Sequence, residues 1–211
     1  TAVDLWVSDQ TTATTTYGEI NTWDVSQIDD MSDLFRDKTT FNSDISNWNT
    51  SSVTSMSFMF ANTNFNQPIG NWDVSNVINM GSMFRDATSF DQDLSSWDVS
   101  SVTGMSFMFE NSAFNQPIGN WNTISVANMS YMFADTNFNQ DISTWDVSSV
   151  TNMYAMFQGA TSFDQDISTW DVSNVNDMSL MFRFSALNQP IGTWDVSNVT
   201  NMTEMFQGAT S

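Results

Sequence analysis

The sequence predicts an α/β fold, a right-handed solenoid of about eight coils in which each coil holds a short parallel strand and a short helix. Two observations support this prediction. Tryptophan recurs every 24 or 25 residues, at Trp23, Trp48, Trp72, Trp97, Trp121, Trp145, Trp170 and Trp194. The twelfth residue after each of them is a phenylalanine, at Phe35, Phe60, Phe84, Phe109, Phe133, Phe157, Phe182 and Phe206. The variation in length therefore lies between the phenylalanine and the next tryptophan.

The first part of each unit predicts a short strand. In Leu94-Ser-Ser-Trp97-Asp-Val99, the tryptophan and the valine are two residues apart, so both face one side of an extended chain. Asp98 lies between them and faces the other side. Stacked coils would place such strands about 4.8 Å apart in a parallel sheet.

The middle part of each unit predicts a helix of two turns. Val102, Met105, Met108 and Phe109 have the spacing of one apolar stripe on a helix. A serine just before the stripe, such as Ser100, can cap that helix.

Methionine and tryptophan are both assigned to the core. All 15 methionines occupy the two methionine positions of these segments, and Leu34 fills the one that remains. Methionine-rich surfaces can serve as docking grooves, but identical spacing in every unit favours packing. A row of exposed indoles would suggest sugar stacking. Burial is favoured instead, because tryptophan shares its face with valine and isoleucine.

The last part of each unit predicts turns that return the chain to the next strand. A polar row follows its phenylalanine, comprising Asn42, Asn66, Asp91, Asn115, Asn139, Asp164 and Asn188. Side-chain amides in such a row are expected to bond the backbone of the neighbouring coil. Asp91 with Asp93, and Asp164 with Asp166, form a weak candidate calcium site. Calcium loops usually bring more ligands and a glycine.

The two ends of the chain depart from the repeat. Residues 1–19 fit the pattern poorly and predict a degenerate N-terminal coil or a linker, rich in threonine from Thr11 to Thr16. Residues 20–211 carry the repeat. The sequence stops in the middle of a unit without a polar capping coil, which leads us to expect a fragment of a longer protein.

Composition excludes several classes of function. The net charge of −20 at pH 7 repels nucleic acid and anionic membranes, and the absence of cysteine excludes disulfides. No run of residues is long and apolar enough for a signal segment or a membrane span. Three of the 4 basic residues, Arg36, Arg85 and Arg183, follow the phenylalanine that ends a predicted helix, where a cation is favourable.

The residues available for catalysis argue against an enzyme. Without histidine or cysteine, only a site of two carboxylates remains among the usual catalytic arrangements. An active site breaks a repeat at one place, whereas these acids recur in every unit. We therefore expect no enzymatic activity and no cofactor, apart from the weak calcium candidate.

An acidic row is the candidate ligand-binding surface. The residue between the tryptophan and the valine of each predicted strand is expected to face away from the core. These residues are Asp24, Asn49, Asp73, Asp98, Asn122, Asp146, Asp171 and Asp195. Neighbouring carboxylates in the row repel one another. A cationic partner or a metal would offset that repulsion, and exposed sheets are where repeat arrays bind. The alternative is a solvated face that resists aggregation, with the two asparagines diluting its charge.

The repeat resembles a known family. The runs Trp-Asp-Val-Ser-Asn-Val-Thr-Asn-Met at 194–202 and Met-Phe-Gln-Gly-Ala-Thr-Ser-Phe-Asp-Gln-Asp-Ile-Ser-Thr-Trp at 156–170 are similar to the BspA-type leucine-rich repeat surface proteins of bacteria and mycoplasmas. The resemblance covers residues 20 to 211, with Leu187 in place of the usual phenylalanine and Ile124 in place of a serine. It implies a leucine-rich-repeat-like fold, a surface-exposed or secreted location and a role in adhesion, and it brings no catalytic residues.

These observations predict an extracellular or cell-surface module that binds a protein or glycan on another cell or host surface through the acidic row. A passive rigid spacer on the cell surface is the first alternative. Binding to ice is the second, but the row before tryptophan mixes Asn47, Ser96 and Thr144 instead of repeating one side chain.

Overall fold

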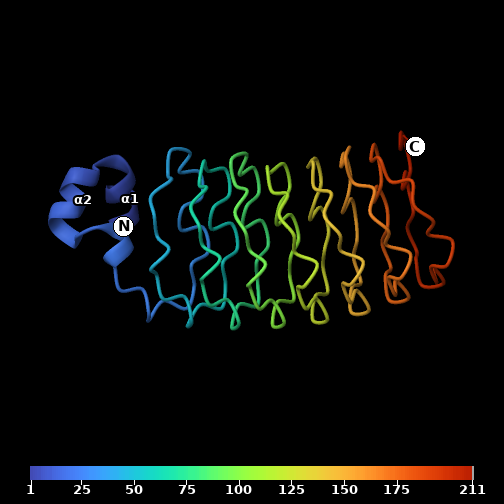
Figure 1. Ribbon diagram of the computed structural model, residues 1–211, viewed down its shortest axis with the longest axis horizontal. Coiled ribbons are helices and arrows are strands. Elements are labelled where there is room, and N and C mark those ends of the chain that lie inside the picture. The colour runs from blue at the N-terminus through green and yellow to red at the C-terminus, as the bar shows by residue number, and fades with distance from the viewer. Residues whose placement is uncertain (211) are drawn as a thin grey trace.

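Two short helices and a stack of coils make up the structure (Figure 1). The computed structural model describes residues 1–210. Helix α1 spans Ala2–Ser8, α2 spans Gln10–Tyr17 and the 3-10 helix η1 spans Ile20–Thr22. From there the chain winds through successive coils that lie side by side, with the helices at one end and the C-terminus at the other (Figure 1).

The coils are built from turns. Within residues 1–210 no helix follows η1, and no strand extends beyond a single bridge. The predicted α/β solenoid of parallel strands and helices is therefore wrong. The Trp97 N–H donates to the Leu94 carbonyl (3.1 Å), and the Met108 N–H donates to the Met105 carbonyl (3.2 Å). Because the first and fourth residues of a β-turn lie within about 7 Å of each other, apolar residues three apart meet in the core without a helix.

Backbone conformation explains why the methionine segments are not helical. Phe107 and Asn111 have φ values of 59° and 50°, in the left-handed region, and the equivalent residues of the other coils share it. A right-handed helix needs negative φ at every residue. A turn with a left-handed third residue resembles type II, which favours glycine or asparagine there. Gly159 and Gly208 take the Asn111 position in two coils.

Neighbouring coils are joined by backbone hydrogen bonds from alternate residues. The Met105 N–H donates to the Asn128 carbonyl (3.0 Å), and the Phe107 N–H donates to the Ser130 carbonyl (2.8 Å). The parallel bridges between coils are isolated pairs: Asp30 with Ser55, Ser55 with Asn79, Asn79 with Gly104, Gly104 with Asn128, Asn128 with Asn152, Asn152 with Asp177, and Asp177 with Asn201. Intervening N–H groups close turns within their own coil, so no continuous sheet forms.

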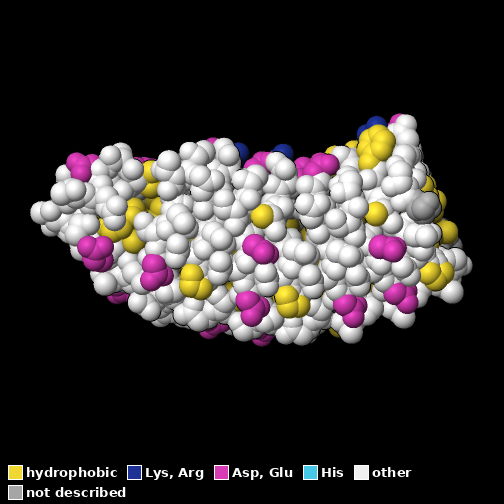
Figure 2. Space-filling view, turned by 45° about the horizontal axis from the view of Figure 1, so that its top comes forward, with side chains coloured by type: hydrophobic (Ala, Val, Ile, Leu, Met, Phe, Trp, Pro, Cys, Tyr) yellow, Lys and Arg dark blue, Asp and Glu magenta, His cyan; other side chains and the backbone are white. Residues whose placement is uncertain are grey.

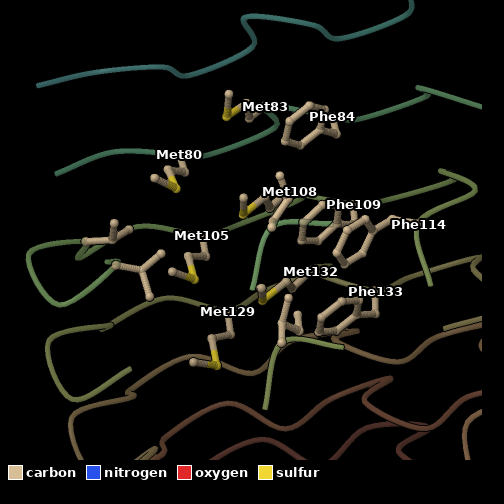
Figure 3. Close-up of a cluster of buried hydrophobic side chains, with 14 of the residues drawn as sticks. Met80, Met83, Phe84, Met105, Met108, Phe109, Phe114, Met129, Met132 and Phe133 are labelled. Atoms are coloured by element: carbon tan, nitrogen blue, oxygen red, sulfur yellow. The ribbon is translucent and has the colours of Figure 1, made fainter. Parts of the chain in front are cut away.

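The core consists of columns of identical side chains. Figure 3 shows successive coils stacking Met80, Met105 and Met129 in one column and Phe84, Phe109 and Phe133 in another. The rings of Phe84 and Phe109 are parallel, with centroids 5.7 Å apart. The predicted burial of the methionine and phenylalanine columns is confirmed, except that Met202 and Phe206 of the last coil are exposed.

The tryptophans form a buried column as predicted, from Trp48 to Trp194, whereas Trp23 is only half-buried. Each buried indole N–H donates to a carbonyl of the preceding coil. The Trp97 Nε1–H, for example, donates to the Ile69 carbonyl (3.1 Å). A buried tryptophan needs such a partner, so the column bonds coil to coil as well as filling the core.

Helices α1 and α2 cover the first coil, so residues 1–19 form a helical hairpin instead of the expected coil or linker. Val3 and Trp6 are buried, and the Trp6 Nε1–H donates to the Ser43 hydroxyl (2.9 Å). Lys38 of the first coil pairs with Asp4 at 2.6 Å. Among the described residues, no helix has the length and apolar character needed to cross a membrane.

Candidate functional site

The acidic row is exposed, as predicted, but it lies on turns and not on a sheet. In each coil Oδ1 of this residue accepts a hydrogen bond from the N–H two residues on. Ser100, expected to cap a helix, donates in this way to Asp98 (3.0 Å), and Ile124 donates to Asn122 (3.4 Å). The same bond is made by Asp24, Asn49, Asp73, Asp146, Asp171 and Asp195. Aspartate and asparagine both stabilise turns this way, which explains why the row accepts either.

Hydrogen bonds and charges act in opposite directions on these carboxylates. The Ser75 hydroxyl, followed by its backbone N–H, lowers the pKa of Asp73, while the charge of Asp98 in the next coil acts to raise it. Asp195 shows the same balance between Ser197 and the charge of Asp171. Aspartates of the row therefore repel one another where they stand in neighbouring coils, and each also serves as the turn acceptor of its own coil.

The second polar row is confirmed as a ladder between coils. Its Oδ1 atoms accept from the backbone N–H of the equivalent residue in the next coil, as when the Asn115 N–H donates to Asp91 (2.8 Å). The adjacent glutamines reinforce it, and Gln140 Nε2 donates to Asn115 at 3.1 Å. These side chains satisfy backbone groups, which is a structural role.

The four candidate calcium ligands are also occupied by backbone donors. Asp91 and Asp164 accept from the next coil, at 2.8 Å each, and Asp93 and Asp166 accept from serines two residues on, at 2.8 and 2.9 Å. Nowhere in residues 1–210 do three or more acidic side chains gather closely enough to hold a metal ion. The structure does not assemble a coordination set from them.

One column changes its side chain from coil to coil instead of repeating it. It is the left-handed position between the two methionines of each coil, held by Asp33, Phe58, Ser82, Phe107, Tyr131, Ala155, Leu180 and Glu204. Phe107 stacks on Tyr131 with centroids 4.5 Å apart, and Tyr131 meets Tyr154 edge to face at 5.0 Å. Tyr154 stands where most other coils have serine. We name Phe107, Tyr131, Tyr154 and Leu180 the aromatic edge; all four are half-buried.

The arginines lie over aromatic rings. The predicted role at helix C-termini is wrong because no helix ends there. Arg36 lies 4.5 Å from the Phe58 ring, and Arg85 lies 5.3 Å from the Phe107 ring. Arg85 also pairs with Glu110 at 2.6 Å. Burial raises the pKa of Glu110, and the charge of Arg85 opposes that rise.

Two shallow hollows lie beside these rings. One of about 280 Å³ is lined by Tyr154, Ser179, Leu180, Asn201, Thr203 and Glu204. Another of about 230 Å³ is lined by Arg36, Asp37, Phe58, Ala61, Asn62, Arg85 and Asp86. Figure 2 shows acidic side chains along the whole length of the molecule, with the basic ones at its upper edge.

The aromatic edge was not predicted from the sequence. The signal was an aromatic residue between two methionines, as at Phe107 and Tyr131.

Comparison with known proteins identifies the family and leaves the activity open. The family described as "Mycoplasma protein of unknown function, DUF285" matches residues 6–117 and again residues 108–211, so two tandem matches cover nearly the whole chain. Neither a curated protein nor a solved structure matches the chain. The tandem matches agree with the repeat of tryptophan and phenylalanine, and the chain belongs to this family of repeat proteins.

Proposed function

We propose that the chain is a non-enzymatic binding module of the cell surface that holds a protein or glycan partner at the aromatic edge. The observation that carries the proposal is that the residues of the aromatic edge depart from the repeat. The other repeated polar positions are explained by turns and ladders, whereas Phe107, Tyr131 and Tyr154 place three large, half-buried rings against one another in successive coils. Phe58 is the only ring at these positions in the other coils. Aromatic side chains at the surface are enriched in binding interfaces.

The resemblance to BspA-type surface proteins supports the surface location and the adhesive role. The acidic row contributes a long-range field to this function instead of a contact surface, because its side chains already serve as turn acceptors. Such a field steers oppositely charged partners.

A glycan and protein array, probed with the chain in the presence and absence of calcium, tests the proposal. We expect specific binding that calcium leaves unchanged. An Asp146→Asn/Asp171→Asn variant keeps the Oδ1 turn acceptors while it removes two charges, so its binding at physiological salt should stay within about twofold of the parent. Loss of binding in this variant would restore the acidic row as the contact surface.

A passive rigid spacer is the second candidate. The unbroken core columns from Trp48 to Trp194 favour it, because a stack whose coils pack only on their neighbours can project another domain. The spacer predicts no binding on any array and no effect of aromatic-edge variants on adhesion. Array binding that these variants abolish excludes it.

A further inference from the structure

We infer that the second coil, residues 48–71, carries a separate binding site, a notch that takes a short neutral oligosaccharide. Two hollows of about 230 Å³ each lie over this coil and its neighbours. Asn62 and Asp86 line both hollows, so the two adjoin. The notch lies outside the aromatic edge, and its ligand goes beyond the proposed function.

The first hollow exists because a short turn stands between two longer ones. Between its left-handed residue and the next core phenylalanine, the second coil has only Thr63 and Asn64, whereas the first and third coils have three residues there. The longer turns contribute Thr39 and Thr88 to the walls of the hollow, and the short turn lines it with Thr63 and Asn64. The missing residue of the second coil thus leaves an open space between its neighbours.

The second hollow exists because a small residue stands between two arginines. Ala61 directly follows the core phenylalanine of the second coil, the position that Arg36 and Arg85 hold in the first and third coils. These three residues and Phe58 are among those that line the hollow. A short turn and a small side chain therefore lower the surface of the same coil at two adjoining places.

Several polar groups of the first hollow have no partner in the protein. Within residues 1–210, the side chains of Thr39, Asn64 and Thr88 make no hydrogen bond to another protein group, and all three are exposed. They come from three successive coils and line one space. They are therefore available to a ligand without the loss of any bond that stabilises the fold.

Two further asparagines present acceptors to the same hollow. The Asn62 amide group donates to Asp37 (3.0 Å), and the Asn111 amide group donates to Asp86 (2.8 Å). These bonds use the Nδ2 atoms and fix the two side chains, while the Oδ1 atoms remain as acceptors. A hollow with oriented amide groups is a preformed polar site.

The chemistry of these groups matches the hydroxyls of a neutral sugar. A threonine hydroxyl and an asparagine amide can each donate and accept, as the hydroxyls of a sugar ring do. An anionic ligand would be repelled by Asp86 and by the net charge of −20. A cationic ligand would find Asp86 already engaged, because Asn111 donates to it and Arg85 lies 3.6 Å away.

The size and walls of the hollows favour a disaccharide over a peptide. Each hollow is smaller than the sites of drug-sized ligands, which measure about 300 to 1,000 Å³, and each therefore suits one sugar ring. The first hollow has no aliphatic or aromatic wall that could select a peptide by its apolar side chains. Phe58 and Ala61 of the second hollow offer a surface to the C–H groups of a second ring.

The test uses four neutral disaccharides as probes, lactose, maltose, cellobiose and diacetylchitobiose, with binding followed by saturation-transfer NMR. We expect at least one of them to bind, with an affinity that stays level between about 0.05 and 0.5 M salt, because a neutral ligand is not subject to screening. The key variant is Asn64→Ala/Thr88→Ala, which removes two groups that bond nothing else in the protein and changes no charge. The loss of two hydrogen bonds should weaken binding about tenfold.

The matched control is Asn137→Ala/Thr161→Ala, the same change at the equivalent exposed positions of another short coil and the long coil that follows it. Its affinity should stay within about twofold of the parent. A second variant, Ala61→Gln, fills the second hollow with the uncharged residue that Gln158 and Gln207 provide in other coils. It should weaken binding of the disaccharide more than binding of the methyl glycosides of its two sugars.

Four outcomes overturn the inference. They are the absence of binding by all four disaccharides, equal affinity of Asn64→Ala/Thr88→Ala and the parent, an equal loss in the control, and tighter binding of sialyllactose than of lactose, since the last would assign the notch to anions. None of them bears on the proposed function, because the aromatic edge lies on other coils. A partner held at that edge should keep its affinity in Asn64→Ala/Thr88→Ala.

Discussion

The length of a coil, 24 or 25 residues, correlates with a single buried hydroxyl. In the shorter coils, the third residue after the core phenylalanine is a buried threonine or serine, at Thr63, Ser112, Thr136 and Ser185. The Thr136 hydroxyl donates to the Phe133 carbonyl (2.8 Å) and accepts from the Phe138 N–H (3.4 Å). The longer coils have Lys38, Ala87 or Ala160 there and one more residue, and a backbone carbonyl takes over as acceptor. A hydroxyl can thus replace part of a backbone turn.

We predict that Thr136→Val destabilises the chain by about 1 to 3 kcal/mol. Valine keeps the shape of threonine, so the loss reflects buried groups left without their partner. Urea unfolding followed by tryptophan fluorescence measures it. Thr161→Val, at an exposed threonine of a longer coil, is the control and should change the free energy of unfolding by less than about 0.5 kcal/mol. Equal effects would show that the Thr136 hydroxyl does not stabilise the short turn.

The turn acids predict a loss of stability in acid. Hydrogen bonds from Ser75 and Ser100 lower the pKa values of Asp73 and Asp98 in the folded state. Groups with a lowered folded pKa contribute stability that is present above the unfolded value, near 3.9, and is lost as pH falls through the folded value. An Asp73→Asn/Asp98→Asn variant keeps both acceptors but cannot titrate. Its stability, followed by circular dichroism from pH 6 to pH 2, should fall less steeply than that of the parent. A slope as steep as the parent's would refute this role of the turn bonds.

At the level of the coil, the sequence predicted the repeat period and the buried columns but misassigned the local structure. Apolar residues stand three positions apart in the pairs Leu94/Trp97 and Met105/Met108, and that spacing fits a β-turn as well as a helix. What separates the two is the left-handed backbone at Phe107. An aromatic residue gives no sign of that conformation in the sequence, because glycine and asparagine are its usual markers.

The candidate site was likewise predicted only in part from the sequence. Exposure of the acidic row followed from alternation around the buried Trp97 and Val99, and the structure has Asp98 exposed. Its role did not follow, because the bond from Ser100 to Asp98 depends on a turn that was taken for a strand. The contact of Tyr131 with Tyr154 joins two different positions of successive coils, so no single column of the repeat contains it.

Two glycines of the same turn give a matched test of how closely coils approach. A Cβ added at Gly70 would lie 2.6 Å from the Asp93 carbonyl oxygen of the next coil, whereas one added at Gly192 meets nothing within 4 Å. Gly70→Ala forces two backbones apart and should destabilise the chain by about 1 to 3 kcal/mol. Gly192→Ala should leave stability level or raise it by up to about 1 kcal/mol. Thermal and urea unfolding of the pair measure the difference, and similar values for both variants would contradict the close packing.

Over the whole molecule, bonds and packing join each coil to the next, while charge repulsion acts where aspartates of the turn row stand in neighbouring coils. Indole bonds, ring columns and backbone bonds all join residues one coil apart, as at Trp97 with Ile69 and Phe84 with Phe109. The acids of the turn row lie one coil apart as well, and Asp171 acts directly on Asp195. Stability of such arrays is a sum of neighbour terms, so a change at one aspartate reports on the repulsion between aspartates of neighbouring coils.

The salt dependence of stability separates that repulsion from the turn bonds. Asp171 lies in the row between Asp146 and Asp195 of the neighbouring coils, and it also accepts the Ser173 N–H at 3.1 Å. Asp171→Asn keeps an acceptor and removes the charge, so its melting temperature should exceed that of the parent at about 0.02 M salt. At about 0.5 M salt the Debye length is near 4 Å, and half or less of that gain should remain. Asp171→Ala removes the acceptor as well and should melt below Asp171→Asn at both salt concentrations, because the turn bond is local and is not screened. A gain for Asp171→Asn that is independent of salt would show that repulsion along the row does not limit the stability of the stack.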